Sequence, residues 1–284
     1  MTIALPIIIV SLIGLVAGVG LTLAAKYMAV SVDERAARIN SVLPGANCGA
    51  CGFAGCSDYA SAIVDSGAKP NLCPVGGADV AAKISTVLGV EVDAAEQRYA
   101  RVRCAGTFSK TRYVMRYRGM QSCAANKTFY RGRGACPNAC LGYGDCTYAC
   151  NYGAIYMYHG VAVVDKDKCV ACGLCVERCP NKLIELARGG SDIFVRCSNT
   201  EKGKVTRSMC SVGCIACGRC VKACKFGAVE IENNLAAIDQ EKCVGCGLCV
   251  KECPMNIIRK YSDPSFPHHR AKSASPAGGQ AAQG

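Results

Sequence analysis

Twenty-four cysteines are the chemically distinctive residues of this 284-residue sequence. Most stand two or three residues apart, in C-x-x-C and C-x-x-x-C patterns. Cysteines this close in sequence make poor disulfide partners because a disulfide requires a particular separation and orientation of the two side chains. They can, however, bind one metal centre together. The spacing therefore predicts metal ligation rather than a disulfide scaffold.

A duplication organises the second half of the chain. "CVACGLCVERCP" (169–180) aligns with "CVGCGLCVKECP" (243–254), and the offset in residue number is 243 − 169 = 74. Extended upstream without a gap, the alignment matches most of the remaining cysteines and places one tyrosine opposite a cysteine. The matched pairs are Cys123 with Cys197, Cys136 with Cys210, Cys140 with Cys214, Tyr143 with Cys217, Cys146 with Cys220 and Cys150 with Cys224.

Each copy contains C-x2-C-x2-C-x3-C-P, the bacterial ferredoxin run for 4Fe–4S clusters. Zinc sites also use C-x2-C pairs, but as two separated pairs rather than triplets that end in Cys-Pro. In two-cluster ferredoxins the fourth cysteine of each run binds the other cluster. The rule predicts four sets: Cys136, Cys140, Cys146 and Cys179; Cys150, Cys169, Cys172 and Cys175; Cys214, Cys217, Cys220 and Cys253; Cys224, Cys243, Cys246 and Cys249.

A fifth set lies nearer the N-terminus, in "PGANCGACGFAGC" (44–56) and the residues that follow. Cys48, Cys51, Cys56 and Cys73 form C-x2-C-x4-C-x16-C, four thiols for one more 4Fe–4S cluster. The intervening glycines permit a tight wrap around the cluster. Helices are expected over 58–67 and 77–89.

Four cysteines remain outside these five sets. Five clusters are expected. Because twenty-four cysteines divide into six sets of four, a sixth cluster is a hypothesis, and buried free thiols are the other interpretation. Its members would be Cys104, Cys123, Cys197 and Cys210. Because Cys136 and Cys210 are matched in the repeat, Cys210 and Cys217 compete for one ligand role.

The first 25 residues contain no charged side chain, and residues 4–25 are almost wholly apolar. A helix of this length can span a hydrocarbon core of about 30 Å. A cleaved signal peptide would need a basic N-terminal region, which is absent before Lys26. We therefore predict a single-pass anchor, and Lys26, Arg35 and Arg38 after it predict that the rest of the chain is cytoplasmic. A reducing compartment also agrees with thiolate ligands.

A basic segment with interleaved aromatic residues precedes the duplication. Between Arg98 and Arg133 there are ten Lys or Arg residues and no acid. Such a stretch could dock an acidic electron carrier or another subunit, face anionic lipid, or bind single-stranded nucleic acid. Docking of an acidic electron carrier or of another subunit is favoured. The formal net charge of +12 does not indicate nucleic acid, because five oxidised clusters with their thiolates would contribute about −10.

These patterns predict an α+β fold of small metal-dependent domains. Short apolar alternations at 154–165 and 228–239 predict β-hairpins, and 182–186 and 256–260 predict further strands. The expected parts are a transmembrane anchor (1–27), a helical 4Fe–4S domain (28–92), a basic linker (93–135), two ferredoxin-like units (136–190 and 191–260) and a disordered tail (261–284).

This order of parts resembles the B subunits of the Rnf ion-translocating ferredoxin:NAD oxidoreductase complexes, in their long form with two ferredoxin-like units. The resemblance implies an electron-transfer protein of the bacterial cytoplasmic membrane, with soluble ferredoxin and sibling flavin- and NAD-carrying subunits as partners. The chain itself has no G-x-G-x-x-G dinucleotide motif. The alternatives are a membrane-tethered polyferredoxin of another complex and, in a different class, an iron–sulfur sensor or nucleic-acid-binding protein.

Overall fold

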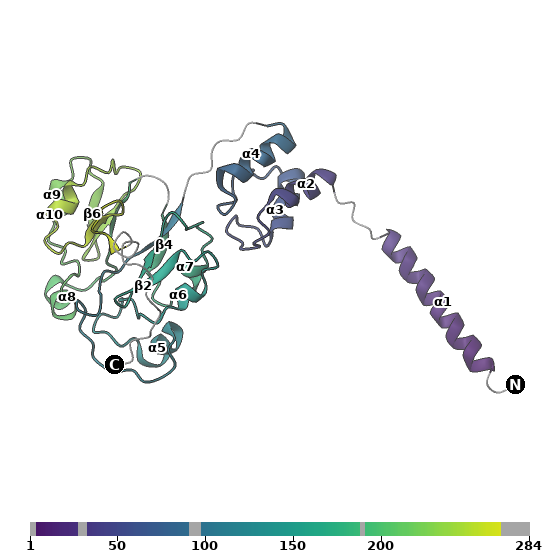
Figure 1. Cartoon of the computed structure of the whole chain (residues 1–284), viewed down its shortest axis with the longest axis horizontal. Helices are drawn as coiled ribbons and strands as arrows, with labels where there is room; N and C mark the ends of the chain where they lie inside the picture. The colour runs from purple at the N-terminus through teal and green to yellow at the C-terminus, as the bar shows by residue number, and fades with distance from the viewer. Residues whose placement is uncertain (1–3, 28–32, 91–97, 188–190, 268–284) are drawn as a thin grey trace.

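The computed structural model describes residues 4–27, 33–90, 98–187 and 191–267. Within them the protein is built from short helices and four two-stranded antiparallel sheets (Figure 1). The mixture of small helical and strand elements agrees with the predicted α+β class.

Helix α1 (Ala4–Tyr27) covers the apolar N-terminal stretch. The predicted helix is therefore present. Among the described residues, however, no helix meets the length and hydropathy of a membrane span. The side chains of residues 4–7, 10 and 25–27 lie outside that description. The helix is confirmed, whereas the transmembrane assignment stays a prediction.

Three helices form the N-terminal domain: α2 (Glu34–Val42), α3 (Cys56–Asp65) and α4 (Gly77–Leu88). The last two occupy the segments where helices were expected. Their apolar faces enclose a small core centred on Ile39, Tyr59 and Ile84. The hydroxyl of Tyr59 donates to the carbonyl of Lys69 at 2.7 Å and accepts from the N–H of Leu72 at 3.1 Å, which ties the loop before Cys73 to α3.

Both predicted hairpins are present. Strands β2 (Ile155–Tyr158) and β3 (Val161–Val164) form one, and β6 (Val229–Glu232) and β7 (Leu235–Ile238) form the other. Each turn has two residues with positive φ, His159-Gly160 in the first and Asn233-Asn234 in the second. Two such residues make the tight turn whose twist matches that of the flanking strands.

A second sheet in each unit was only half predicted. Strand β4 (Ile184–Ala187) pairs with β1 (Tyr99–Val102), and β8 (Ile258–Lys260) pairs with β5 (Ile193–Val195). Strand β1 lies in the segment predicted as a basic linker, so part of that segment belongs to the first ferredoxin-like unit.

The pairing partners show which residues of the two units are equivalent. Val102 lies opposite Ile184, and Val195 lies opposite Ile258. The numbers of Ile184 and Ile258 differ by 258 − 184 = 74, but those of Val102 and Val195 differ by 195 − 102 = 93. The first unit therefore carries an insertion of 93 − 74 = 19 positions between its first strand and its hairpin. The ungapped alignment was wrong upstream of this insertion.

Six short helices complete the two units. They are α5 (Cys123–Tyr130), α6 (Asp145–Tyr148), α7 (Leu174–Arg178), α8 (Gly203–Met209), α9 (Arg219–Ala223) and α10 (Leu248–Glu252). Four of them, α6, α7, α9 and α10, begin after a glycine with positive φ. Glycine adopts this conformation without steric cost, which lets the chain turn sharply from a cysteine loop into the helix.

The end of the described chain fastens the two units together. Tyr261, predicted to open a disordered tail, is 2% exposed, and Phe266 is 3% exposed. The Tyr261 hydroxyl donates to the carbonyl of Val164 and accepts from the N–H of Lys166 at 2.8 Å. The residues that follow β8 therefore cover the hairpin of the first unit.

Tyr261→Phe should weaken this connection. The change keeps the buried ring but leaves the Val164 carbonyl and the Lys166 N–H without the hydroxyl. An unsatisfied buried group costs about 1–3 kcal/mol. We expect the midpoint of guanidinium unfolding to fall, measured by circular dichroism under anaerobic conditions. Tyr148→Phe, at a tyrosine that is 86% exposed, is the matched control and should leave the midpoint unchanged. Equal midpoints for the two variants would contradict a stabilising role for the Tyr261 hydroxyl.

Candidate iron–sulfur sites

Cysteine thiols gather around cavities in the described part of the chain. Five cavities of about 310 to 390 Å³ are each lined by four cysteines. Among the described residues, no group of three or more His, Cys, Asp or Glu is arranged to hold a single metal ion. Four thiols spread over the wall of a cavity suit a polynuclear cluster, because each thiolate binds a different iron of the cluster.

The N-terminal cavity is lined by Cys48, Cys51, Cys56 and Cys73, the set expected from the sequence. Its loop is fixed by Asn47, whose side-chain oxygen accepts the N–H of Cys56 at 2.8 Å. The N–H of Gly76 points to the sulfur of Cys73 at 3.4 Å. Such N–H bonds to sulfur tune the potential of a bound cluster.

The C-x2-C-x2-C run of the first unit surrounds a second cavity. Cys150, Cys169, Cys172 and Cys175 line it, again as expected. The N–H of Ala154 donates to the sulfur of Cys150, and the N–H of Ala100 in β1 donates to the sulfur of Cys169, both at 3.3 Å. Strand β1 therefore contributes directly to this site.

In the second unit, Cys214, Cys217, Cys220 and Cys253 line one cavity, as expected. The remaining set contains Cys224, Cys243, Cys246 and Cys249. The N–H of Ala228 donates to the sulfur of Cys224 at 3.3 Å, the counterpart of the bond from Ala154 in the first unit. Burial raises the pKa of Cys249 to about 11, and the nearby thiols of Cys243, Cys220, Cys246 and Cys224 contribute to the rise.

The structure differs from the expected sets by one exchange. The third cavity is lined by Cys123, Cys140, Cys146 and Cys179, so Cys123 stands where Cys136 was expected. The cause is Asp145, which begins α6. Its carboxylate accepts the N–H groups of Cys123 at 2.8 Å and Ala124 at 3.0 Å, and the hydroxyl of Ser122 at 2.9 Å. These bonds place the start of α5 beside Cys146.

The exchanged Cys136 lines a different cavity, together with Cys104, Cys197 and Cys210. A short backbone ladder brings it there. The N–H of Ala135 donates to the carbonyl of Arg112 at 2.8 Å, and the N–H of Arg112 donates to the carbonyl of Met209 at 2.9 Å. Cys136 and Cys210, which follow Ala135 and Met209, are thereby brought to the same cavity.

One signal in the sequence could have revealed the grouping. The tripeptide Val-Arg-Cys occurs at 102–104 and again at 195–197, with the same offset that the strand pairing shows. Cys104, and not Cys123, is therefore the counterpart of Cys197. Sequence reasoning also missed Arg196, a 7% exposed cation beside the thiols of this cavity.

Burial governs the electrostatics of the thiols. It raises the pKa of Cys136, Cys140 and Cys175 to about 12, because a thiolate is disfavoured away from water. In the absence of a metal these groups stay neutral at physiological pH. Ligation would supply the positive charge that a buried thiolate needs.

The exchange can be tested with single substitutions. Cys123→Ala should change the same electron paramagnetic resonance (EPR) signal of the reduced chain as Cys179→Ala, because the two thiols face one cavity. Cys136→Ala should leave that signal intact. The set expected from the sequence alone would give the opposite result, with Cys136→Ala and Cys179→Ala affecting one signal and Cys123→Ala sparing it.

Three protein families match parts of the chain. The Fe-S cluster family matches residues 43–75, the 4Fe-4S binding domain matches 162–185, and the 4Fe-4S dicluster domain matches 213–257. The matches cover the four cysteines and α3 of the N-terminal domain and the cysteine run of each unit.

Relatives of known name cover most of the chain. It is 42% identical to the B subunit of the Na(+)-translocating ferredoxin:NAD(+) oxidoreductase complex of Acetobacterium woodii. The 257 aligned residues are 90% of this chain and 77% of that protein. It is 41% identical to the B subunit of the ion-translocating oxidoreductase complex of Methanosarcina acetivorans, over 81% of this chain and 88% of that protein. With the B subunit of the proton-translocating ferredoxin:NAD(+) oxidoreductase complex of Clostridium ljungdahlii it shares 38% identity over 84% and 85% of the two chains. Together with the cysteine-lined cavities, these similarities show that the chain belongs to the family of B subunits of ion-translocating oxidoreductase complexes.

Proposed function

We propose that this chain is the iron–sulfur electron-transfer subunit of a membrane-bound, ion-translocating ferredoxin:NAD oxidoreductase, the Rnf type. It accepts electrons from reduced ferredoxin and passes them toward the subunits that reduce NAD. The observation that carries the proposal is the succession of four-cysteine sites from the N-terminal domain to the end of the second unit. When bound, 4Fe–4S clusters supply one-electron carriers at low potential.

Neighbouring sites share the elements that line them. Ala100 and Val102, two residues apart on β1, line the cavity of Cys169 and the cavity of Cys146 respectively. A strand rises about 3.3 Å per residue, so the walls of the two cavities are about 7 Å apart along β1. This spacing supports passage of electrons from one cluster to the next.

The N-terminal site also lies close to the first unit. Burial raises the pKa of the Cys172 thiol, and the nearby Cys48 thiol adds to the rise. Cys48 and Cys172 line different cavities. Their proximity supports electron exchange between the N-terminal domain and the first ferredoxin-like unit.

The insertion in the first unit supplies a surface for an acidic partner. Lys110, Arg112 and Arg116 are exposed on it, together with Met120 (74% exposed) and Phe129 (74% exposed). A segment that exposes both basic and apolar side chains fits an acidic electron carrier, because charge speeds the encounter and apolar contact holds the complex. We assign this surface to soluble ferredoxin.

Helix α1 is proposed as the membrane anchor of the complex. Its described side chains include Ile8, Leu12, Ile13, Leu15 and Val16, each between 62% and 65% exposed. A contiguous exposed apolar surface of this kind marks contact with lipid or with another apolar helix. The basic residues that follow α1 favour the cytoplasmic side for the rest of the chain.

The test is ferredoxin-dependent NAD reduction in inverted membrane vesicles from cells with and without this chain. We expect both NAD reduction and ion uptake to disappear without the chain and to return when it is restored. Undiminished NAD reduction would overturn the proposal in favour of a polyferredoxin that serves another complex.

Reversal of charge on the insertion should weaken ferredoxin docking. For the triple variant Lys110→Glu, Arg112→Glu and Arg116→Glu, we expect the KM for ferredoxin to rise at least about tenfold at low salt. The effect should shrink as ionic strength rises, because salt screens exposed charges.

The matched control carries the same change of charge on the second unit. It replaces the exposed Lys222, Lys225 and Lys251 by Glu. An unchanged KM in this control supports docking on the insertion. A larger rise in KM for the control than for the insertion variant would place ferredoxin on the second unit instead.

A further inference from the structure

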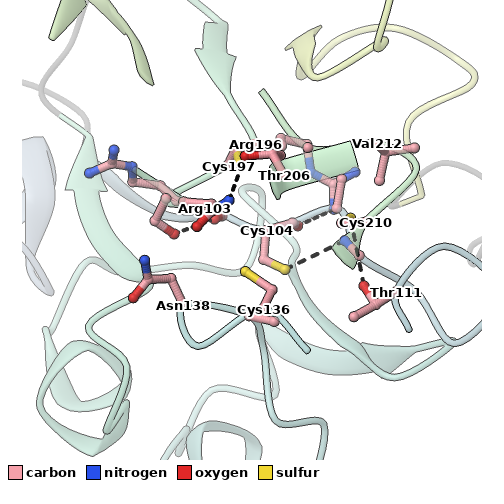
Figure 2. Close-up of a pocket in the computed structure, with 16 residues that line it drawn as sticks. Arg103, Cys104, Thr111, Cys136, Asn138, Arg196, Cys197, Thr206, Cys210 and Val212 are labelled. Carbon is pink, nitrogen blue, oxygen red and sulfur yellow. Dashed lines mark hydrogen bonds between the residues drawn. The ribbon is translucent and has the colours of Figure 1, made fainter. Parts of the chain in front are cut away.

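One cavity takes all four of its cysteines from outside the segments that the family comparisons match. Cys104, Cys136, Cys197 and Cys210 line it, in the region where the two ferredoxin-like units meet (Figure 2). None of the four falls within residues 43–75, 162–185 or 213–257. Its volume of about 350 Å³ falls within the range of 310 to 390 Å³ of the cavities that contain the ferredoxin-type runs and the N-terminal motif. We call it the junction site.

The two units contribute equivalent residues to the junction site. Cys104 follows β1 and Cys197 follows β5, at the same position relative to the paired strand. The N–H of Arg103 donates to the carbonyl of Leu183, as the N–H of Arg196 donates to that of Ile257, both at 2.8 Å. Cys136 and Cys210 occupy the same position in the two copies of the repeat and form the second equivalent pair. Each unit thus supplies two thiols.

Cys104 and Cys197 also accept equivalent hydrogen bonds at sulfur. The N–H of Cys140 donates to the sulfur of Cys104, and the N–H of Cys214 donates to the sulfur of Cys197, both at 3.4 Å. Cys140 and Cys214 are themselves matched in the repeat. The sulfur of Cys104 also accepts the N–H of Gly106 at 3.4 Å. Backbone N–H bonds to sulfur favour thiolates that bind a cluster over thiols packed as small apolar groups.

All four thiols line the same cavity, and three of them are buried. Cys104, Cys136 and Cys197 are 7%, 9% and 8% exposed. Four thiols that share one cavity can bind one cluster together.

A buried cation stands beside the same cavity. Arg196 lines it and is 7% exposed, and its guanidinium donates to the carbonyl of Cys104 at 3.1 Å. Its Nε has no hydrogen-bond partner among the described residues. A buried charge is costly unless a charge of opposite sign lies nearby. A 4Fe–4S cluster with four thiolates is an anion and would supply that charge.

We propose that the junction site holds a sixth 4Fe–4S cluster, bound by Cys104, Cys136, Cys197 and Cys210, and that this cluster connects the two ferredoxin-like units. The ligand set contains Cys136 in place of Cys123. The proposal extends the proposed electron-transfer function, but the presence of the cluster can be tested without that function.

The connection follows from the ligands on either side. Cys140 lines the cavity of the first unit and Cys214 lines that of the second, and each donates its N–H to a junction sulfur. One-electron exchange along this route oxidises the donor cluster by one electron and reduces the acceptor cluster by one electron. No bond is made or broken and no proton moves.

Anaerobic native mass spectrometry of the full chain, reconstituted with iron and sulfide, counts the clusters directly. Six clusters correspond to about 24 iron atoms and five to about 20, since each cubane holds four. We expect about 24 for the unsubstituted chain and about 20 for the double variant Cys104→Ala and Cys197→Ala. A count of about 20 for the unsubstituted chain, or of about 24 for the double variant, would refute the ligand set.

Asn138→Ala is the matched control. Asn138 lines the junction cavity, but its side chain has no sulfur to bind iron. Its replacement by alanine keeps the backbone N–H that donates to the sulfur of Cys136. It should retain about 24 iron atoms. Loss of about four iron atoms in this control as well would mean that any disturbance of the junction empties the site. In that case the conservative pair Cys136→Ser and Cys210→Ser decides, because its oxygen ligands should retain a cluster with a shifted EPR signal. Unchanged EPR spectra for that pair would refute ligation.

The connecting role has its own readout. After one electron equivalent of reduced ferredoxin is mixed with the chain, freeze-quench EPR follows the appearance of reduced clusters in each unit. We expect the exchange between units to slow at least about tenfold in the Cys104→Ala, Cys197→Ala variant, with the other signals unchanged. An unchanged rate would show that electrons pass between the units by another route.

Discussion

Burial of sulfur is the constraint on which the remaining structure depends. Each unit has a small core, in which cysteine side chains pack together with aliphatic ones. In the first unit, Cys104, Cys136 and Cys146 lie in the hydrophobic cluster, and in the second, Cys197, Cys214 and Cys220 do. Small domains of this kind rarely bury enough apolar surface to be stable without staples or metals. We therefore expect cluster binding and folding to be coupled in these units.

The loops obey the same constraint. Glycines with positive φ precede α6, α7, α9 and α10, each of which carries a cysteine, and backbone N–H groups at Ala154 and Ala228 point at sulfur. Residues of both hairpins line cysteine cavities, Ile155 and Val164 in the first unit and Ile231 and Ala236 in the second. Each unit therefore consists mainly of cysteine-bearing loops joined by short helices and two-stranded sheets.

Much of this arrangement follows from local sequence. The ferredoxin runs, the N-terminal motif and both hairpins depend on spacing and turn chemistry within short segments of chain, and the structure has them where the sequence predicts. The exchange of Cys123 and Cys136 depends on contacts that no local pattern contains. It requires Asp145 to bind the start of α5, far back along the chain, and Arg112 to pair with the still more distant Met209. The insertion in the first unit also shifts the apparent repeat. An ungapped alignment therefore matches Cys197 with Cys123, although strand pairing matches it with Cys104.

The distribution of the junction thiols along the chain has a consequence for biogenesis. The N-terminal set is complete at Cys73 and the sets of the first unit at Cys175 and Cys179, but the junction set is complete only at Cys210. During synthesis, the first unit can therefore acquire its clusters while Cys104 and Cys136 still lack their counterparts. The proposed junction cluster therefore cannot have its full ligand set until β5 and α8 have been made. We expect it to assemble after the clusters of the first unit.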